Sequence, residues 1–221
     1  MVNTFYFRPM PGRVLQQEGS PSRPLPRTSA ESVESLTENQ AARRARVIKA
    51  ALELGGQGGY EAVQMRDVAA HANVALGTIY RYFTSKDHLL AASMVDWSAD
   101  LRRRVAERPP TAPEAADRMV DVIRRATRMM ERQPSLAAAL VTACSAHDPG
   151  VVACQREVTA TIKEVLAAPI TELEPQRRDG VVMLLAHVWH SVNIEWVDGA
   201  KSVEQVGEEL ETAARLLLAE G

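Results

Sequence analysis

The sequence predicts an all-α fold of about nine helices. Apolar residues recur along most of the chain at intervals of three and four, and no segment shows the strict alternation of a half-buried strand. Aromatic residues are few, whereas Ala, Leu, Arg and Glu, which favour helices, are abundant. Glycine and proline clusters fall between the periodic segments, where they end one helix and precede the next. These observations favour helices packed on helices.

Residues 1–37 differ from the rest of the chain in composition. Prolines at positions 9, 11, 21, 24 and 26 lie among serine, arginine and glutamine residues and prevent a regular helix. We interpret this segment as a flexible arm; an upstream start codon that adds residues without function is an equal alternative. Because no apolar run approaches the ~18 residues that span a bilayer, we expect a cytoplasmic protein that enters no membrane. In that compartment Cys144 and Cys154 are expected as reduced thiols.

The first firm helix is predicted from Glu38 to about Leu54, where the glycine-rich run at 55–59 frees the backbone to turn. Two short helices joined by a tight turn follow within residues 63–83. Asn73 supplies the turn, since asparagine tolerates a left-handed backbone. In the second short helix, Ile79 belongs to a buried apolar side, and the opposite side carries small, hydroxyl-bearing, aromatic and cationic groups. Such a surface helix beside a tight helical turn can read DNA, which makes a helix-turn-helix the leading hypothesis.

Six more helices are predicted in the remainder of the chain. Thr84 and Asp87 form a capping pattern for the first of them, Pro134 suits the first turn of another, and Pro169 should bend or end a long one. The expected ranges are 86–107, 113–133, 134–145, 151–168, 176–197 and 202–219. The segment 176–197 carries apolar groups on more than one side, which implies burial on more than one side.

Charge is distributed unevenly along the chain. Residues 39–90 contain seven Lys and Arg against four Asp and Glu, a net charge of +3, whereas residues 91–221 contain 15 against 20, a net charge of −5. A basic end on an acidic remainder is what phosphate binding by that end requires.

The run GTIYRYFTSKDHLL, preceded by MRDVAAHANVA, resembles the DNA-binding domain of TetR-family transcriptional regulators. In that family this pattern covers the recognition helix and the start of the helix after it. The resemblance implies a helix-turn-helix head at residues 38–84 and a ligand-binding and dimerisation body at residues 85–221. It also implies a ligand-responsive DNA-binding regulator that acts as a repressor.

The resemblance assigns the DNA contacts position by position. Arg66 would meet a phosphate or a guanine edge, Gly77 would allow close backbone approach, and Tyr80 and Tyr82 would pack against the sugar-phosphate backbone. The alternative is that the tyrosines pack the head and Lys86 is a solvated cap. The full expected set is Arg43, Arg44, Gln64, Met65, Arg66, Leu76, Gly77, Thr78, Tyr80, Tyr82 and Lys86.

The body is expected to enclose an apolar cavity for a small-molecule effector, since methionines adapt to the shape of a ligand. Ordinary core packing is the alternative for each residue taken alone. His187 and His190 are three apart, but no second ligand pair follows, so we expect neither a metal nor a cofactor. The candidate cavity residues are Met119, Ile123, Met129, Met130, Leu136, Leu140, Cys144, Val158, Ile162 and Trp189.

TetR-like proteins pair through their last two helices, so the resemblance implies a symmetric homodimer. The two-sided apolar pattern at 176–197 agrees with a helix that serves both the core and a second subunit. The expected interface residues are Val181, Leu185, Val188, Val192, Val206, Leu210 and Leu217.

Three segments, GGYEAVQMRDVA, RQPSLAAALVTA and HVWHSVNIEW, resemble one subfamily, the repressors of cholesterol catabolism in mycobacteria and rhodococci. That resemblance implies an effector of steroid-acid type, as a coenzyme A thioester, that releases operator DNA. A repressor responding to drugs or to fatty acyl-CoA is the alternative within the class. A helical ligand-binding protein or an enzyme without DNA activity is the alternative outside it. The sequence contains no nucleophile elbow, paired metal-binding carboxylate motif or glycine-rich phosphate loop, so we expect no enzyme.

Overall fold

The computed structural model describes residues 38–219, which form nine α-helices and one 3-10 turn and contain no strand. The predicted all-α class is therefore confirmed, and the predicted arm at 1–37 lies outside the described residues. The elements are α2 (Glu38–Ala62), α3 (Met65–His71), α4 (Leu76–Tyr82), α5 (Lys86–Glu107), α6 (Ala115–Arg132), α7 (Pro134–Ala143), α8 (Pro149–Ala167), η1 (Ala168–Ile170), α9 (Pro175–Val197) and α10 (Val203–Leu218).

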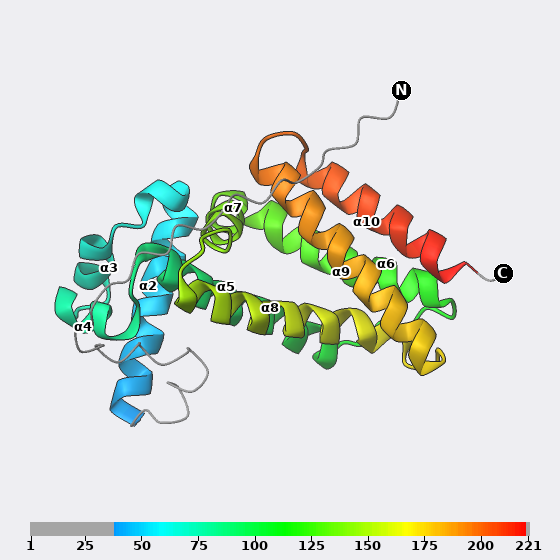
Figure 1. Ribbon diagram of the computed structural model, residues 1–221, viewed down its shortest axis with the longest axis horizontal. Coiled ribbons are helices and arrows are strands. Elements are labelled where there is room, and N and C mark those ends of the chain that lie inside the picture. Colours follow the sequence, from blue (N-terminus) through cyan, green and yellow to red (C-terminus); the bar gives the residue numbers. More distant parts are fainter. Residues whose placement is uncertain (1–37, 220–221) are drawn as a thin grey trace, which may run out of the picture.

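Helices α2, α3 and α4 form a head at one end of the molecule (Figure 1). The turn between α3 and α4 contains Asn73 at a φ of 52°, a left-handed conformation that asparagine adopts more readily than most residues. Val68, Ile79 and Phe83 are buried and hold the two short helices against α2. The helix-turn-helix geometry thus follows from one turn residue and a few apolar anchors.

Helix α2 continues beyond the predicted end at Leu54, which corrects the sequence prediction. A Cβ atom on Gly55 would lie only 2.9 Å from Cδ1 of Leu136, so the missing side chain lets α7 pack closely against a continuing helix. The backbone leaves helical values only at Gly58 and at Gly59, where φ is 69°. Part of the glycine run therefore serves close packing, and part breaks the helix.

The cap of helix α5 is Ser85, not Thr84 as the sequence pattern predicted. The Ser85 hydroxyl accepts a hydrogen bond from the backbone N–H of His88 at 3.0 Å. The Thr84 hydroxyl instead donates to Oδ2 of Asp148, 64 residues away at the start of α8, at 3.0 Å. A contact between distant segments has replaced the local one.

The buried apolar residues form two clusters along the molecule. One joins α2, α3 and α4 to the first turns of α5, to α7 and to the first turns of α8, and it includes Leu140, Val151 and Cys154. The other joins α6, α9 and α10 to the far parts of α5 and α8. Helices α5 and α8 belong to both clusters and run from the head into the body (Figure 1).

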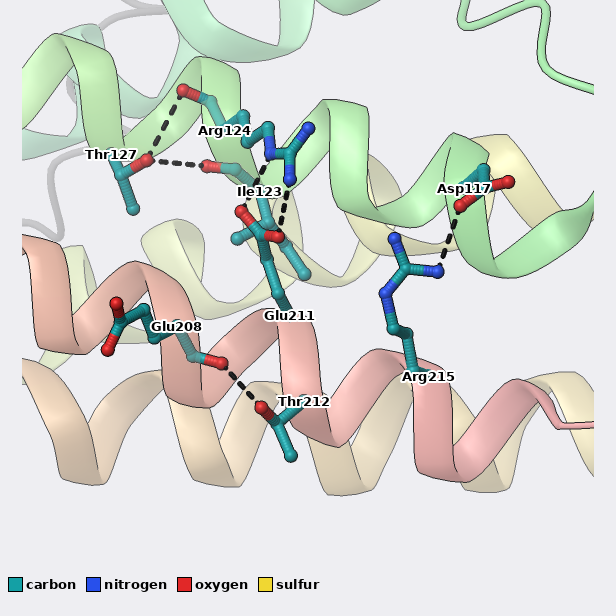
Figure 2. Close-up of polar contacts among 8 residues, drawn as sticks. All are labelled: Asp117, Ile123, Arg124, Thr127, Glu208, Glu211, Thr212 and Arg215. Carbon is teal, nitrogen blue, oxygen red and sulfur yellow. Dashed lines mark hydrogen bonds and ion pairs between the residues drawn. The ribbon is translucent and has the colours of Figure 1, made fainter.

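Helix α10 packs on α6 through buried apolar residues and a row of polar contacts. Figure 2 shows the guanidinium of Arg124 facing the carboxylate of Glu211, with both N–O distances at 2.8 Å, and Arg215 donating to Asp117 at 2.9 Å. Exposed ion pairs of this kind contribute about 0–1 kcal/mol each. Apolar burial along α10, for example of Leu210, therefore supplies most of the attachment.

Candidate DNA-binding surface and effector cavity

Helix α4 presents one face to the head core and the other to the surroundings. Ile79 is fully buried, whereas Gly77 and Arg81 are exposed and Tyr80 is 52% exposed. A Cβ atom built on Gly77 would meet nothing within 4 Å, so the backbone stands clear of the rest of the protein there. The outer face of α4, flanked by the half-buried Thr78, is therefore open to the surroundings.

Six further predicted DNA residues lie in two kinds of environment. Gln64 and Arg66 are exposed at the start of α3, with Nε2 of Gln64 donating to the carbonyl of Glu61 at 3.0 Å. The remaining four, Arg43, Arg44, Met65 and Leu76, are half-buried. Met65 and Leu76 pack against the head core, and the guanidinium of Arg44 lies 5.5 Å from the ring centroid of Phe83.

Tyr82 combines packing with an unused polar group. Its ring lies against Phe83 with 6.3 Å between centroids, and Arg81 lies 5.6 Å from its centroid. The Tyr82 hydroxyl is buried and has no hydrogen-bond partner in the described part of the chain. A buried hydroxyl without a partner is rare in folded proteins, and an incoming acceptor oxygen can satisfy it.

Lys86 is engaged with the head itself. Its Nζ donates to the carbonyl of Tyr60 at 3.1 Å and lies 3.6 Å from the centroid of the Tyr60 ring. The Tyr60 hydroxyl donates to Asp87 at 2.5 Å, and burial together with this bond raises the pKa of Tyr60 to about 12. Sequence reasoning missed Tyr60, because no local spacing marks a partner 27 residues away.

The body encloses a cavity of about 380 Å³ between α5, α6, α7, α8 and α9. This volume lies within the usual range for small-molecule sites. Met130, Cys144, Val158, Ile162 and Trp189 line it, as the sequence predicted. Residues that sequence reasoning missed also line it, chiefly on α5 and α9: Met94, Trp97, Ser98, Leu101, Ala186, His190, Asn193 and Ile194. Their helical spacing gave no signal beyond core packing.

The other five predicted cavity residues do not line this cavity, which corrects that prediction. Leu136 and Leu140 are buried in the cluster that joins α7 to the head. Met119 and Ile123 are buried, and Met129 is half-buried, in the cluster of α6 with α9 and α10. All five are apolar and in helices, but their helix faces point at neighbouring helices rather than at the cavity.

The cavity wall changes character from inside to outside. Ser98 and Asn193 are buried polar residues within it, whereas Ser145, Thr159 and His190 are exposed at its rim. Burial raises the pKa of the Cys144 thiol to about 12, so this thiol stays protonated and unreactive at neutral pH. A mostly apolar wall with a polar rim suits an amphipathic molecule.

Comparisons with known proteins agree with this arrangement. Residues 47–93 match the family described as bacterial regulatory proteins, tetR family, and residues 113–217 match the tetracyclin repressor-like C-terminal domain. The HTH-type transcriptional repressor KstR of Rhodococcus jostii is 36% identical over 183 residues, covering 82% of this chain and 85% of the relative.

The chain belongs to the TetR family of bacterial regulators. A crystal structure of a TetR transcriptional regulator from Rhodococcus sp. RHA1 shares 30% identity with a TM-score of 0.72, covering 83% of this chain and 99% of that one. Thermus thermophilus FadR in complex with lauroyl-CoA has the same fold, at 22% identity and a TM-score of 0.63, covering 79% and 93%. This TetR-family chain is thus a DNA-binding transcriptional regulator and not an enzyme.

In this TetR-family protein the two halves meet around His88, the third residue of α5. His88 is 3% exposed, its Nδ1 accepts from the backbone N–H of Thr84 at 3.2 Å, and its Nε2 has no partner within the described residues. A Cβ atom on Gly150 would lie 2.6 Å from Nδ1, so the start of α8 rests directly on this ring. Burial lowers the pKa of His88, against the opposing effect of Asp148. A neutral imidazole therefore joins the head to α8.

Most residues predicted for the subunit interface are buried within the single protomer. Val181, Leu185, Val192, Val206 and Leu210 are at most 4% exposed and belong to the core shared by α6, α9 and α10. Val188 and Leu217 are half-buried against the same core. The apolar residues that reach the surface of α9 and α10 are different ones, Met183, Leu184 and Leu216, which are 46%, 45% and 75% exposed.

Two other features bear on the type of protein. No described helix is both long enough and apolar enough to cross a membrane. Within the described residues, no cluster of three or more His, Cys, Asp and Glu could hold a metal ion.

Proposed function

We propose that this regulator is a homodimeric repressor that binds operator DNA through α4 of each protomer and releases it when a small amphipathic effector occupies the cavity. The observation that carries the proposal is that α5 connects the two sites. This helix begins at the head, directly after α4 in the chain, and it also lines the cavity. Such a protein acts where the bacterial chromosome lies, in the cytoplasm. The DNA contacts are those of the exposed α4 and α3 residues with Tyr82 and the α2 arginines.

The proposed dimer uses the exposed faces of α9 and α10. Met183 and Leu184 lie on the same face of α9 as Gly180 and His187, and Leu216 lies near the end of α10. Large exposed apolar residues on two adjacent helices favour association with a second copy. In a dimer, two α4 helices about one turn of DNA apart can engage two half-sites.

The proposed coupling runs through α5. Its residues Met94, Trp97, Ser98 and Leu101 line the cavity, and its first turn packs in the head core. An effector that displaces α5 from α8 would move the head and change the separation of the two α4 helices. A 100-fold loss of DNA affinity requires about 2.7 kcal/mol of coupling, which is within the usual allosteric range.

We propose a coenzyme A thioester of a steroid acid as the effector, with a fatty acyl-CoA as the second candidate. The resemblance of three segments to cholesterol-catabolism repressors favours the first, and the similarity in fold to FadR bound to lauroyl-CoA favours the second. Arg156 and Lys163 support a phosphate-bearing group in both cases. They are exposed on α8 on the same side as the rim residue Thr159, and no ion pair engages either of them in the described part of the chain.

Fluorescence anisotropy of the purified protein on DNA from its own upstream region tests the proposal. We expect tight, salt-sensitive binding that a steroid-acid CoA thioester releases. Release by lauroyl-CoA but not by the steroid thioester would favour the second candidate. Tight binding that neither thioester weakens would contradict both effectors and keep the regulator. Binding no tighter than to unrelated DNA would count against control of that promoter, and selection of bound fragments from the whole genome would then identify the operator.

A further inference from the structure

The cavity wall contains an amide whose oxygen has no hydrogen-bond partner in the described part of the chain. Asn193 of α9 lines the cavity and is 7% exposed. Its Nδ2 donates to the carbonyl of Trp189, one turn earlier in the same helix, at 2.7 Å. This bond fixes the side chain and identifies Oδ1 as the accepting atom, because only the nitrogen can donate to a carbonyl; Nδ2 keeps its second N–H. In the described part of the chain Oδ1 has no donor.

A second buried group in the cavity wall is in the same condition. Ser98 of α5 is 1% exposed, and its hydroxyl donates to the carbonyl of Val95 at 2.9 Å. With its proton committed to the backbone, the Ser98 oxygen can only accept another hydrogen bond. Two helices therefore present acceptors inside the same apolar cavity.

These acceptors select for a neutral donor. The cavity wall contains no Asp or Glu, so it offers a buried cation no opposite charge, and burying an unpaired charge is strongly unfavourable. A hydroxyl group can donate to Oδ1 of Asn193 and is neutral at every physiological pH. A ligand that fills the cavity removes Oδ1 from solvent, and leaving it unpaired there is unfavourable, so a ligand that donates to it is preferred over one that cannot.

We propose that the effector carries a hydroxyl group on its buried part, which donates a hydrogen bond to Oδ1 of Asn193. This inference rests on the proposed function, since it assumes that the cavity is the effector site, and it adds a specificity-determining residue and a functional group of the ligand. The hydroxyl lies at Asn193, inside the cavity, and the polar rim at Thr159 and His190 is left for a second polar group.

Two isomeric probes test the proposal: dodecyl alcohol, which can donate, and undecyl methyl ether, which can only accept. Binding is followed by the fluorescence of Trp97 and Trp189, which line the cavity. We expect the wild-type protein to bind the alcohol about tenfold more tightly than the ether, the ratio that one neutral hydrogen bond produces. The Asn193→Leu variant should bind both probes alike. The matched rim variant Thr159→Val should keep the wild-type preference.

Each result has a distinct meaning. Retained affinity of Asn193→Leu for the ether shows that its cavity is intact, and Asn193→Ala repeats the test with a smaller side chain that cannot overfill the site. Equal binding of the two probes by the wild-type protein, or a preference that persists in both Asn193 variants, would overturn the hydroxyl proposal alone. Failure of the wild-type protein to bind either probe would overturn the cavity as an effector site, and this inference with it.

Discussion

At the scale of single residues, the polar groups without partners lie where the proposed function needs them. The Tyr82 hydroxyl on α4 and Nε2 of His88 at the head–body contact are buried without a partner within the described residues. Leaving such a group unpaired costs about 1–3 kcal/mol, which a purely structural residue would have no reason to retain. Both residues therefore point to roles beyond stability.

The Tyr82 hydroxyl gives a prediction in which stability and DNA binding move in opposite directions. Tyr82→Phe should leave the free energy of unfolding unchanged or raise it by up to about 1 kcal/mol, because an unpaired buried hydroxyl disappears. The same variant should bind operator DNA several-fold more weakly if that hydroxyl meets a phosphate. Urea unfolding and anisotropy measure the two effects. Undiminished DNA binding would make Tyr82 a packing residue only.

Tyr80 differs from Tyr82 because its side chain is half exposed and therefore contributes little packing to the stability of the free protein. Tyr80→Ala should weaken operator binding at least about tenfold while changing the free energy of unfolding by less than about 0.5 kcal/mol. Anisotropy on operator DNA and thermal unfolding check the two values. A variant that fails to fold would show that Tyr80 is structural.

His88 makes stability depend on pH. Its pKa is lowered from 6.5 in the folded protein, so the unfolded chain binds a proton more readily. Stability should therefore be complete above pH 6.5 and fall as the pH drops below that value, by at most about 1.4 kcal/mol per pH unit. Urea unfolding between pH 7 and pH 5 should show a smaller fall for His88→Gln. The exposed His187→Gln should retain the wild-type slope.

At the scale of elements, helices α5 and α8 decide how the head is held. Each belongs to both apolar clusters, and Thr84, His88 and Asp148 join the start of one to the start of the other. Asp148 also caps α8, accepting from the N–H of Gly150 at 2.7 Å. The head is therefore fixed to the body through packed helix starts, which is the place where a movement of α5 would reach the DNA.

Gly150 tests this contact between elements. Gly150→Ala should lower the free energy of unfolding by about 1–3 kcal/mol, because its Cβ would lie 2.6 Å from a buried ring that cannot move away freely. Gly56→Ala is the matched control: it lies in helix α2 with nothing within 4 Å and should raise stability by about 0.5–1 kcal/mol. Equal effects of the two substitutions would contradict the tight contact at His88.

At the scale of the whole molecule, the three proposed sites lie on different sets of helices. The proposed DNA-binding surface lies on α3 and α4, at one end of the molecule (Figure 1). The cavity lies among α5 to α9, and the exposed apolar residues lie on α9 and α10. Helix α9 takes part in two of them, since Asn193 faces the cavity and Leu184 faces outward. In the proposed dimer, the shape of the cavity and the geometry of the interface would therefore be linked through one helix.

The assignment of the dimer face is tested by two neighbouring leucines. Leu184→Glu should convert the proposed dimer to a monomer of unchanged fold, with operator affinity reduced because one half-site no longer assists the other. Leu185→Ala, one residue along, should lower the free energy of unfolding by about 2–5 kcal/mol, since Leu185 is fully buried. Light scattering and urea unfolding separate the two outcomes. A dimeric Leu184→Glu variant would exclude this face.

The sequence alone determined the class of fold, the family and the recognition helix, because each depends on local spacing: the turn at Asn73, the buried side of Ile79 and the pattern from Gly77 to Phe83. It did not determine which face of a helix meets which neighbour. Leu185 and Leu184 have the same chemistry and adjacent positions, yet one lies in the core and the other at the surface. Likewise, Leu140 was predicted to line the cavity but lies in the core, whereas Asn193, which was not predicted there, lines it. Ser85 rather than Thr84 caps α5, and Thr84 instead bonds to Asp148, 64 residues away. Only tertiary packing decides these matters, because burial depends on which helices lie side by side, and hydrogen bonds between distant segments leave no periodic trace in the chain.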